Sequence, residues 1–255
     1  MEVVRVAAFV GPGLRGNPAG VVLVDAELPA EERQRIAAEL DLPATAFPVP
    51  RADGGFDLRW HGPTEELAFC GHGTLAAAHV LWGGGRAPLG QLAFATPAGE
   101  LRARPAGEAV ELDLPALPLV DEPVPDGLVQ ALGVDARTVA RGALDVLVEV
   151  ATADAVIAAR PDLPALAALP VRGALLTAQG GPDGADVTSR CFFPAVGIDE
   201  DPATGSAHCL LGPWWAARLG RDVLHARQAS ERGGALTLRM RGERVLLAGL
   251  VAPEG

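Results

Sequence analysis

The 255-residue chain has no lysine and no tyrosine, so all 21 of its basic residues are arginine. Without lysine it cannot form a Schiff base with a carbonyl substrate or pyridoxal phosphate, and it has no P-loop lysine for a nucleotide phosphate. The Tyr/Lys acid–base pair of short-chain dehydrogenase chemistry is excluded as well. Asparagine occurs only at Asn17, and serine only three times. Proton chemistry in this chain therefore depends on His, Asp, Glu and Cys.

Basic charge and long apolar runs are also scarce. The formal charge is −11, which argues against nucleic acid and anionic membranes as partners, because binding to phosphates needs clustered basic residues. No apolar run approaches the roughly 18 residues of a membrane span, and the N-terminus lacks the features of a secretory signal. Three cysteines without metal-type spacing predict a reduced, cytoplasmic protein with no metal site.

Short apolar segments bounded by Gly, Pro and Asp recur along the chain and predict β-strands. The expected strands in the first half are Val3–Phe9, Gly20–Val24, Phe56–His61, Leu92–Thr96, Glu100–Arg104 and Val110–Leu114. Those in the second half are Thr138–Arg141, Asp145–Val150, Ala153–Ala159, Gly173–Gln179, Ala185–Phe193, Ala235–Met240 and Arg244–Leu250. The alternation of strands and helices is too irregular for a doubly wound parallel sheet, so we predict an α+β fold.

Helical periodicity is confined to a few segments. Pro29–Leu40 has proline and acidic residues in its first turn and one apolar face, as an amphipathic helix requires. Thr74–Trp82 and Ser206–Leu219 are apolar nearly all round and predict buried helices. Each of these two follows a Gly-rich loop, and they lie about half a chain apart, which indicates an internal duplication.

The duplication predicts two similar domains, each a curved, mostly antiparallel, barrel-like sheet around one apolar helix. The Pro-rich acidic stretch Leu114–Asp126 resembles a linker between them. We expect an N-terminal domain over residues 1–117 and a C-terminal domain over residues 118–255, and the last strand can return to the first domain. The two Gly-rich loops would then face one another across a cleft.

The first Gly-rich loop, Cys70–Thr74, is the most informative local feature. Glycines before a buried helix leave backbone N–H groups free, and the helix dipole favours a negative charge there. His72 would be close enough to exchange a proton with a bound carboxylate. The loop in the second half offers Asp201, Gly205 and Ser206, so the pair suits proton transfer on a small acid. A plain tight turn, a structural histidine and an N-capping aspartate are the alternatives.

Several nearby polar residues have two interpretations. Cys70 could be a thiolate base near a helix N-terminus or buried filler, and we favour filler for Cys70 and for the other two cysteines. Asn17 could bind a substrate carboxylate or begin a turn. Glu66 could line the cleft or lie on a solvated strand face. His79 and His208 lie in apolar helices and are expected to be hydrogen-bonded core residues.

Taken together, these segments resemble the PhzF-like family of phenazine-biosynthesis isomerases and epimerases, which share the diaminopimelate epimerase fold. The matching segments occur in family order over most of the chain. They are GNPAG (Gly16–Gly20), PAEERQRIAAEL leading into TAF (Thr45–Phe47), the set Arg59, Trp60 and Pro63, Glu66, CGHGT (Cys70–Thr74) and EDPATGSAH (Glu200–His208).

The resemblance implies acid–base isomerisation of a small carboxylic acid, without a cofactor, between two domains of a protein that forms a homodimer. It implies that His72 and Asp201 are catalytic. It also implies that the substrate is bound by a set of residues that we take as Asn17, Gly71, Gly73, Thr74, Gly205 and Ser206.

One position departs from the family pattern. The family has a proton-shuttling glutamate where this chain has Ala44, and Pro43 replaces the preceding serine. A methyl group cannot move a proton, and general acid–base catalysis typically contributes about 10²–10⁴ in rate. Two hypotheses follow: another group (His72, Asp201, Cys70 or Glu66) replaces the glutamate, or the protein binds small acids without isomerising them. A third is a partner-binding protein that keeps only the fold, with an exposed apolar patch as its mark.

Overall fold

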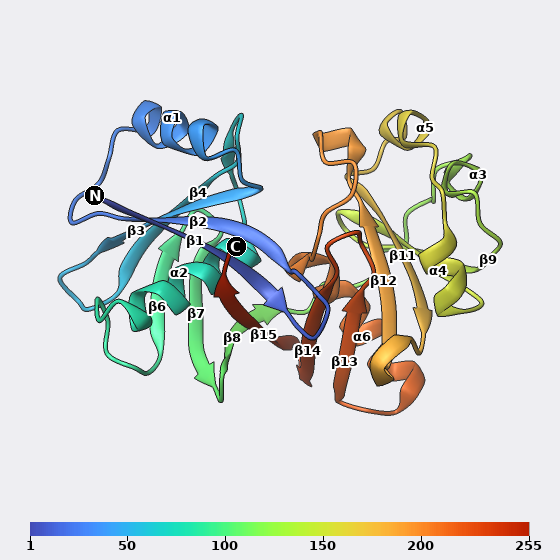
Figure 1. Ribbon diagram of the computed structural model, residues 1–255. Coiled ribbons are helices and arrows are strands. Elements are labelled where there is room, and N and C mark those ends of the chain that lie inside the picture. The colour runs from blue at the N-terminus through green and yellow to red at the C-terminus, as the bar shows by residue number, and fades with distance from the viewer. Residues whose placement is uncertain (255) are drawn as a thin grey trace. The chain divides into compact units, whose positions relative to one another are not determined.

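The computed structural model describes residues 1–254, and the chain divides into two compact units (Figure 1). Unit 1 comprises Met1–Leu114 and Leu246–Gly255, and unit 2 comprises Pro115–Val245. The division thus falls after residue 114, where we expected it after residue 117, and the end of the chain groups with the first unit. No helix within the described residues is long and apolar enough to cross a bilayer.

The sheet of unit 1 closes into a barrel, since the strands follow the order β1–β2–β3–β4–β6–β7–β8–β15 and β1 also pairs with β15. Only the β2–β3 and β4–β6 pairings are parallel among those described. The strands are β1 (Glu2–Val10), β2 (Asn17–Leu23), β3 (Ala44–Pro50), β4 (Phe56–His61), β6 (Leu92–Thr96), β7 (Gly99–Ala106), β8 (Ala109–Pro115) and β15 (Arg244–Pro253), with the short β5 (Glu66–Leu67) beside β4.

Two helices pack on opposite faces of the β3–β4 hairpin. The helix α2 (Gly71–Gly83) is buried on nearly every side, which agrees with its apolar sequence. The amphipathic α1 (Ala30–Leu40) contributes Ile36 to an apolar cluster with Phe47. Because successive side chains of a strand alternate between faces, Ala46 and its cross-strand partner Trp60 lie on the face opposite Phe47.

The strands of unit 2 follow the order β14–β13–β12–β11–β10–β9 with mixed directions, and α6 (Gly205–Leu219) is the longest helix described in this unit. The strands are β9 (Ala136–Arg141), β10 (Asp145–Val150), β11 (Gly173–Gln179), β12 (Val187–Phe192), β13 (Val223–Gln228) and β14 (Gly234–Arg241). Short helices α3 (Leu128–Leu132), α4 (Ala153–Ala158) and α5 (Leu163–Ala167) pack against the other face, and η1 (Pro182–Gly184) and η2 (Pro194–Val196) are single turns. The predicted α+β class is confirmed.

The strand predicted over Ala153–Ala159 is wrong, because this segment is the helix α4. Thr152 caps it by accepting a hydrogen bond from the Ala155 N–H at 3.2 Å, and Asp154 lies in the first turn, where the helix dipole favours negative charge. The helix has six residues, of which only Val156 is buried. So short a segment does not let its apolar residues show a helical period.

A close approach at Gly249 makes this position sensitive to substitution. Phe9 is fully buried and has φ = 65°, and a Cβ at Gly249 would lie 2.4 Å from its ring carbon Cδ1. We expect Gly249→Ala to reduce the free energy of unfolding by about 1–3 kcal/mol, the usual cost of overpacking. Chemical denaturation measures the change, with Gly83→Ala as the control, because a Cβ there meets nothing within 4 Å. Equal stability of both variants would contradict the prediction.

Candidate active site

The first turn of α2 is organised by Cys70, which caps the helix. Its Sγ accepts a hydrogen bond from the Gly73 N–H at 3.3 Å, and its carbonyl accepts the Thr74 hydroxyl at 2.7 Å. The same Sγ lies 3.5 Å from Nδ1 of His72. Cys70 is buried, as expected of filler, and its thiol also contacts both the helix cap and the imidazole.

His72 is partly buried at the second position of α2. Burial lowers its pKa to about 4, although its hydrogen bond with the backbone of Pro18 acts in the opposite direction. The imidazole is thus neutral at neutral pH, and a carboxylate bound beside it would raise its pKa. The contact with Pro18 also brings the GNPAG segment, with the buried Asn17 at the start of β2, to the same end of α2.

Trp60 lies beside this turn and was not among the site residues predicted from the sequence. A Cβ on Gly73 would lie 3.0 Å from Trp60 Cδ1 and 3.0 Å from Cys70 Sγ, so only glycine fits here without displacing a neighbour. The Trp60 indole N–H is buried and has no hydrogen-bond partner within residues 1–254. Only the family resemblance, which includes Arg59 and Trp60, pointed to this residue in the sequence.

Ala44 is the first residue of β3 and is fully buried. It lies opposite Ala19 of β2 in the parallel β2–β3 pair. Since strand residues alternate between faces, its methyl group is on the face of Ala46 and Trp60, the side nearer α2. The residue at this position therefore contributes apolar surface where a glutamate would have contributed a carboxylate.

Glu66 occupies a different environment. It lies on the two-residue strand β5, is exposed, and its Oε1 is 3.5 Å from an Arg59 nitrogen. An exposed ion pair leaves the carboxylate solvated and paired, so Cys70 has the better placement for proton exchange with His72.

In unit 2 the loop before α6 holds Asp201 and Thr204 in a buried hydrogen-bonded arrangement. The Thr204 hydroxyl donates to Asp201 Oδ2 at 2.5 Å, and the Thr204 N–H donates to Gln228 Oε1 at 2.8 Å. Gln228 Nε2 donates to the Asp201 carbonyl at 2.6 Å, which fixes the loop from β13. Gly205 and Ser206 follow as the first residues of α6, so the predicted residues of the second loop are brought together.

His208 is a hydrogen-bonded core residue, as predicted. Its Nδ1 donates to the Thr204 carbonyl at 2.8 Å, and Ser189 Oγ lies 3.3 Å from its Nε2. Burial lowers its pKa to about 4. Burial also raises the pKa of Cys191, to which the charge of Asp201 contributes, and that of Cys209, to about 12, so both remain thiols.

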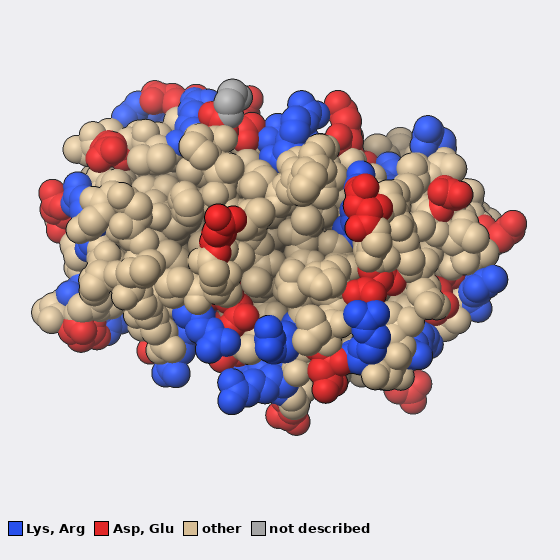
Figure 2. Space-filling view, turned by 60° about the horizontal axis from the view of Figure 1, so that its bottom comes forward, with Lys and Arg blue, Asp and Glu red and all other residues tan. Residues whose placement is uncertain are grey.

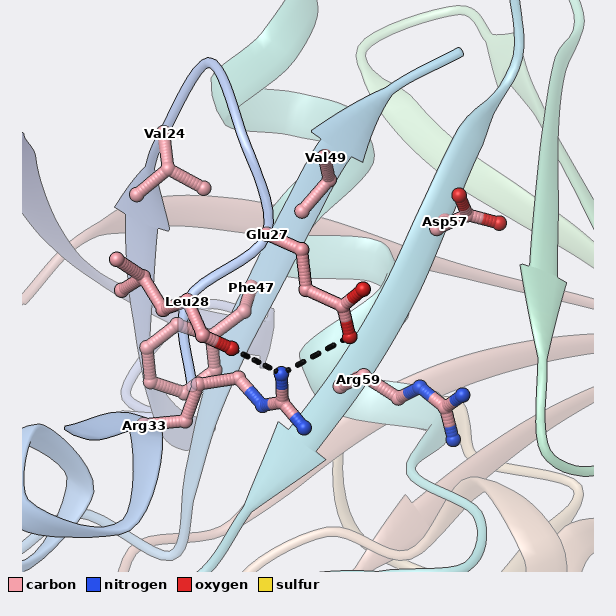
Figure 3. Close-up of a pocket in the computed structure, with 8 residues that line it drawn as sticks. All are labelled: Val24, Glu27, Leu28, Arg33, Phe47, Val49, Asp57 and Arg59. Atoms are coloured by element: carbon pink, nitrogen blue, oxygen red, sulfur yellow. Dashed lines mark hydrogen bonds and ion pairs between the residues drawn. The ribbon is translucent and has the colours of Figure 1, made fainter. Parts of the chain in front are cut away.

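No group of three or more His, Cys, Asp or Glu side chains in the described part of the chain could hold a metal ion. A cavity of about 210 Å³ lies elsewhere in unit 1, on the α1 side of β3 and β4 (Figure 3). None of the predicted site residues lines it.

Comparison with solved structures identifies the fold, and comparison with a family model then identifies the family. A structure of a probable proline racemase from Agrobacterium radiobacter shares the fold with a TM-score of 0.64, at 14% identity over 99% of this chain and 91% of that chain. The fold is therefore that of the racemases and epimerases, as predicted. A PhzF-family structure from Enterococcus faecalis has a TM-score of 0.92, at 35% identity over 99% of this chain and 96% of that chain.

The family model of phenazine biosynthesis-like proteins (PhzC-PhzF) matches residues 6–253, so the chain belongs to this family. A relative from Pseudomonas aeruginosa, named an uncharacterized isomerase, is 45% identical over 98% of this chain and 94% of the relative. The predicted family is confirmed, and membership assigns the chain to the isomerase class.

Proposed function

We propose that this protein is a cofactor-independent isomerase or epimerase that moves a proton on a small carboxylic acid. In this proposal His72 and Asp201 are the acid–base groups, and Cys70 acts with His72 in place of the glutamate replaced by Ala44. The contact of 3.5 Å between Cys70 Sγ and His72 Nδ1 carries the proposal, because it couples a thiol to an imidazole at a helix N-terminus.

The substrate contacts in the proposal come from both helix N-termini. The backbone of Gly71 and Gly73 before α2, and that of Gly205 with the Ser206 hydroxyl before α6, would hold the carboxylate. Asn17 and Thr74 complete the proposed set. The family resemblance is the basis for proposing a cleft between the units, in which one substrate reaches both loops.

The partners are part of the same proposal: a small acid, a second copy of the chain in a cytoplasmic homodimer, and neither nucleic acid nor membrane. On the face in Figure 2, acidic and basic side chains are interspersed, without an extended basic area of the kind that binds phosphates. The three cysteines are thiols and not disulfides, which suits a reducing compartment.

A second function, binding of a small acid without isomerisation, is favoured by Ala44 alone. Deuterium exchange separates the two. The protein is incubated in deuterated water with 2,3-dihydro-3-hydroxyanthranilate and related small acids, and carbon-bound deuterium is followed by NMR. The isomerase proposal expects exchange with the unmodified protein at a rate above that of the acid alone.

Ala44→Glu is the informative variant, because it restores a carboxylate at the position, and Ala44→Gln of nearly equal size is its matched control. Exchange by Ala44→Glu only, with none by the unmodified protein, would support the binding function and contradict isomerisation. Exchange by none of the three would contradict isomerisation of these acids.

A further inference from the structure

The cavity on the α1 side of the sheet has an apolar floor and a charged rim (Figure 3). Val24 and Phe47 are buried in its floor, and Leu28 and Val49 complete it. Four charged side chains line the rest: Arg33, Glu27, Asp57 and Arg59. At about 210 Å³ the cavity is smaller than the usual pockets for drug-sized ligands, so only a small molecule fits.

Arg33 is the buried member of this set, with a side chain only 8% exposed. Its Nε donates to His61 Nε2 at 3.2 Å, and one terminal nitrogen donates to the Leu28 carbonyl at 2.6 Å and to Glu27 Oε1 at 3.2 Å. Because a guanidinium has five N–H groups, the other terminal nitrogen retains its donors. Figure 3 shows this nitrogen on the side of Arg59, away from the Leu28 carbonyl.

The charge of Arg33 is poorly compensated for a buried cation. His61 is an uncharged partner: since its Nε2 accepts from Arg33, its proton is on Nδ1, 2.9 Å from Gln34 Oε1. Burial lowers the pKa of His61; the charge of Glu66 opposes this shift, and the charges of Arg33 and Arg59 add to it. The only carboxylate that reaches Arg33 within the described residues is Glu27, whose side chain is 70% exposed. A buried cation without a firmly held counter-ion favours binding of an anion.

We propose that this cavity binds a small monocarboxylate with an apolar body. The carboxylate would accept hydrogen bonds from the Arg33 guanidinium, and the apolar body would pack on Phe47, Val24 and Val49. Such an anion competes with Glu27 for Arg33 and is repelled by Asp57. The site is distinct from the proposed proton-transfer site, because it lies on the opposite face of the β3–β4 hairpin from α2.

Sodium benzoate is a suitable probe, titrated by NMR with the ring signals of His61 as the local reporter, since the chain has only five histidines. Benzoate is expected to shift the His61 signals, because His61 is hydrogen-bonded to Arg33. Arg33→Met should weaken this binding by about 10–100-fold, as expected for loss of a charge-assisted hydrogen bond. Glu27→Gln should strengthen it about threefold, because the competing carboxylate is removed.

Arg35→Gln is the matched control for Arg33→Met, because Arg35 lies on the same helix, is exposed and pairs only with Glu32 and Glu39 among the residues described. It should leave benzoate binding unchanged. If Arg33→Met fails to fold, the opposite sign expected for Glu27→Gln still tests the proposal. Unchanged or weaker binding in Glu27→Gln, or a preference for benzylammonium over benzoate, would overturn it. Benzoate bound near α2 would leave the His61 signals unshifted. The same titration of His72→Gln distinguishes such binding from binding at the Arg33 cavity.

Discussion

Replacing His72 with glutamine should lower deuterium exchange on a substrate acid by about 10²–10⁴-fold, the usual contribution of a general acid–base group. Glutamine keeps hydrogen-bonding capacity at the start of α2 but cannot gain or lose a proton near neutral pH. The exchange rate in deuterated water, measured by NMR at saturating acid, reports this loss directly. A fall of the rate constant with little change in the binding constant would place His72 in the proton transfer itself.

The matched control is His79→Gln, because His79 lies on the same helix and is only partly buried. We expect it to exchange at the rate of the unmodified protein. If His72→Gln and His79→Gln behave alike, His72 is not the acid–base group, and the proposed role of the α2 loop is wrong.

Cys70→Ser tests whether the Cys70 thiol acts together with His72 in the proton transfer. Serine is a good N-cap, so the variant should keep the hydrogen bond to Gly73 and the start of α2. It replaces a thiol with a hydroxyl that is far harder to ionise. Slower exchange in a folded Cys70→Ser would support the thiol as the partner of His72, and unchanged exchange would reduce Cys70 to a helix cap.

Local patterns predicted the parts of the fold that are encoded by contiguous residues. The helix of Pro29–Leu40 and the two apolar helices after Gly-rich loops are found, although α2 begins at Gly71 and α6 at Gly205, where the glycines are already helical. The predictions fail where the local signal is weak or misleading: α4 has only six residues, and β3 carries Pro48 and Pro50, which argue against a strand. The helix α4 was predicted as a strand, and the strands β3 and β13 were not predicted at all.

The candidate site was predictable to the same extent. The residues of each Gly-rich loop are neighbours in sequence, so their grouping was visible. Contacts between distant segments were not: nothing local links Pro18 to His72, Gln228 to the Asp201 loop, or Arg33 to His61. These contacts arise from sheet closure and from the packing of α1, which bring together residues 24 to 54 positions apart in ways that no periodicity encodes.

Acid should destabilise the protein through its buried histidines, and His208 gives the clearest test. Its folded pKa of about 4 is below the ordinary value of 6.5, so between these values the unfolded chain binds more protons than the folded one. The stability is therefore fully present above pH 6.5 and is lost as pH falls towards 4. A difference of this size corresponds to about 3 kcal/mol of unfolding free energy for a fully buried group.

The physical cause is specific to the geometry of His208. Since the Thr204 carbonyl can only accept, Nδ1 carries the proton of the neutral ring, and Nε2 must accept from the Ser189 hydroxyl. Protonation of Nε2 would place a charge in a fully buried site and force the Ser189 hydroxyl to turn. Denaturation curves from pH 7 to pH 4 should show a smaller loss of stability in His208→Gln than in the unmodified protein, whereas His225→Gln, at an exposed position, should retain the full loss. An equal loss in His208→Gln would show that acid acts through other groups, with His72 the first to examine, because burial lowers its pKa in the same direction.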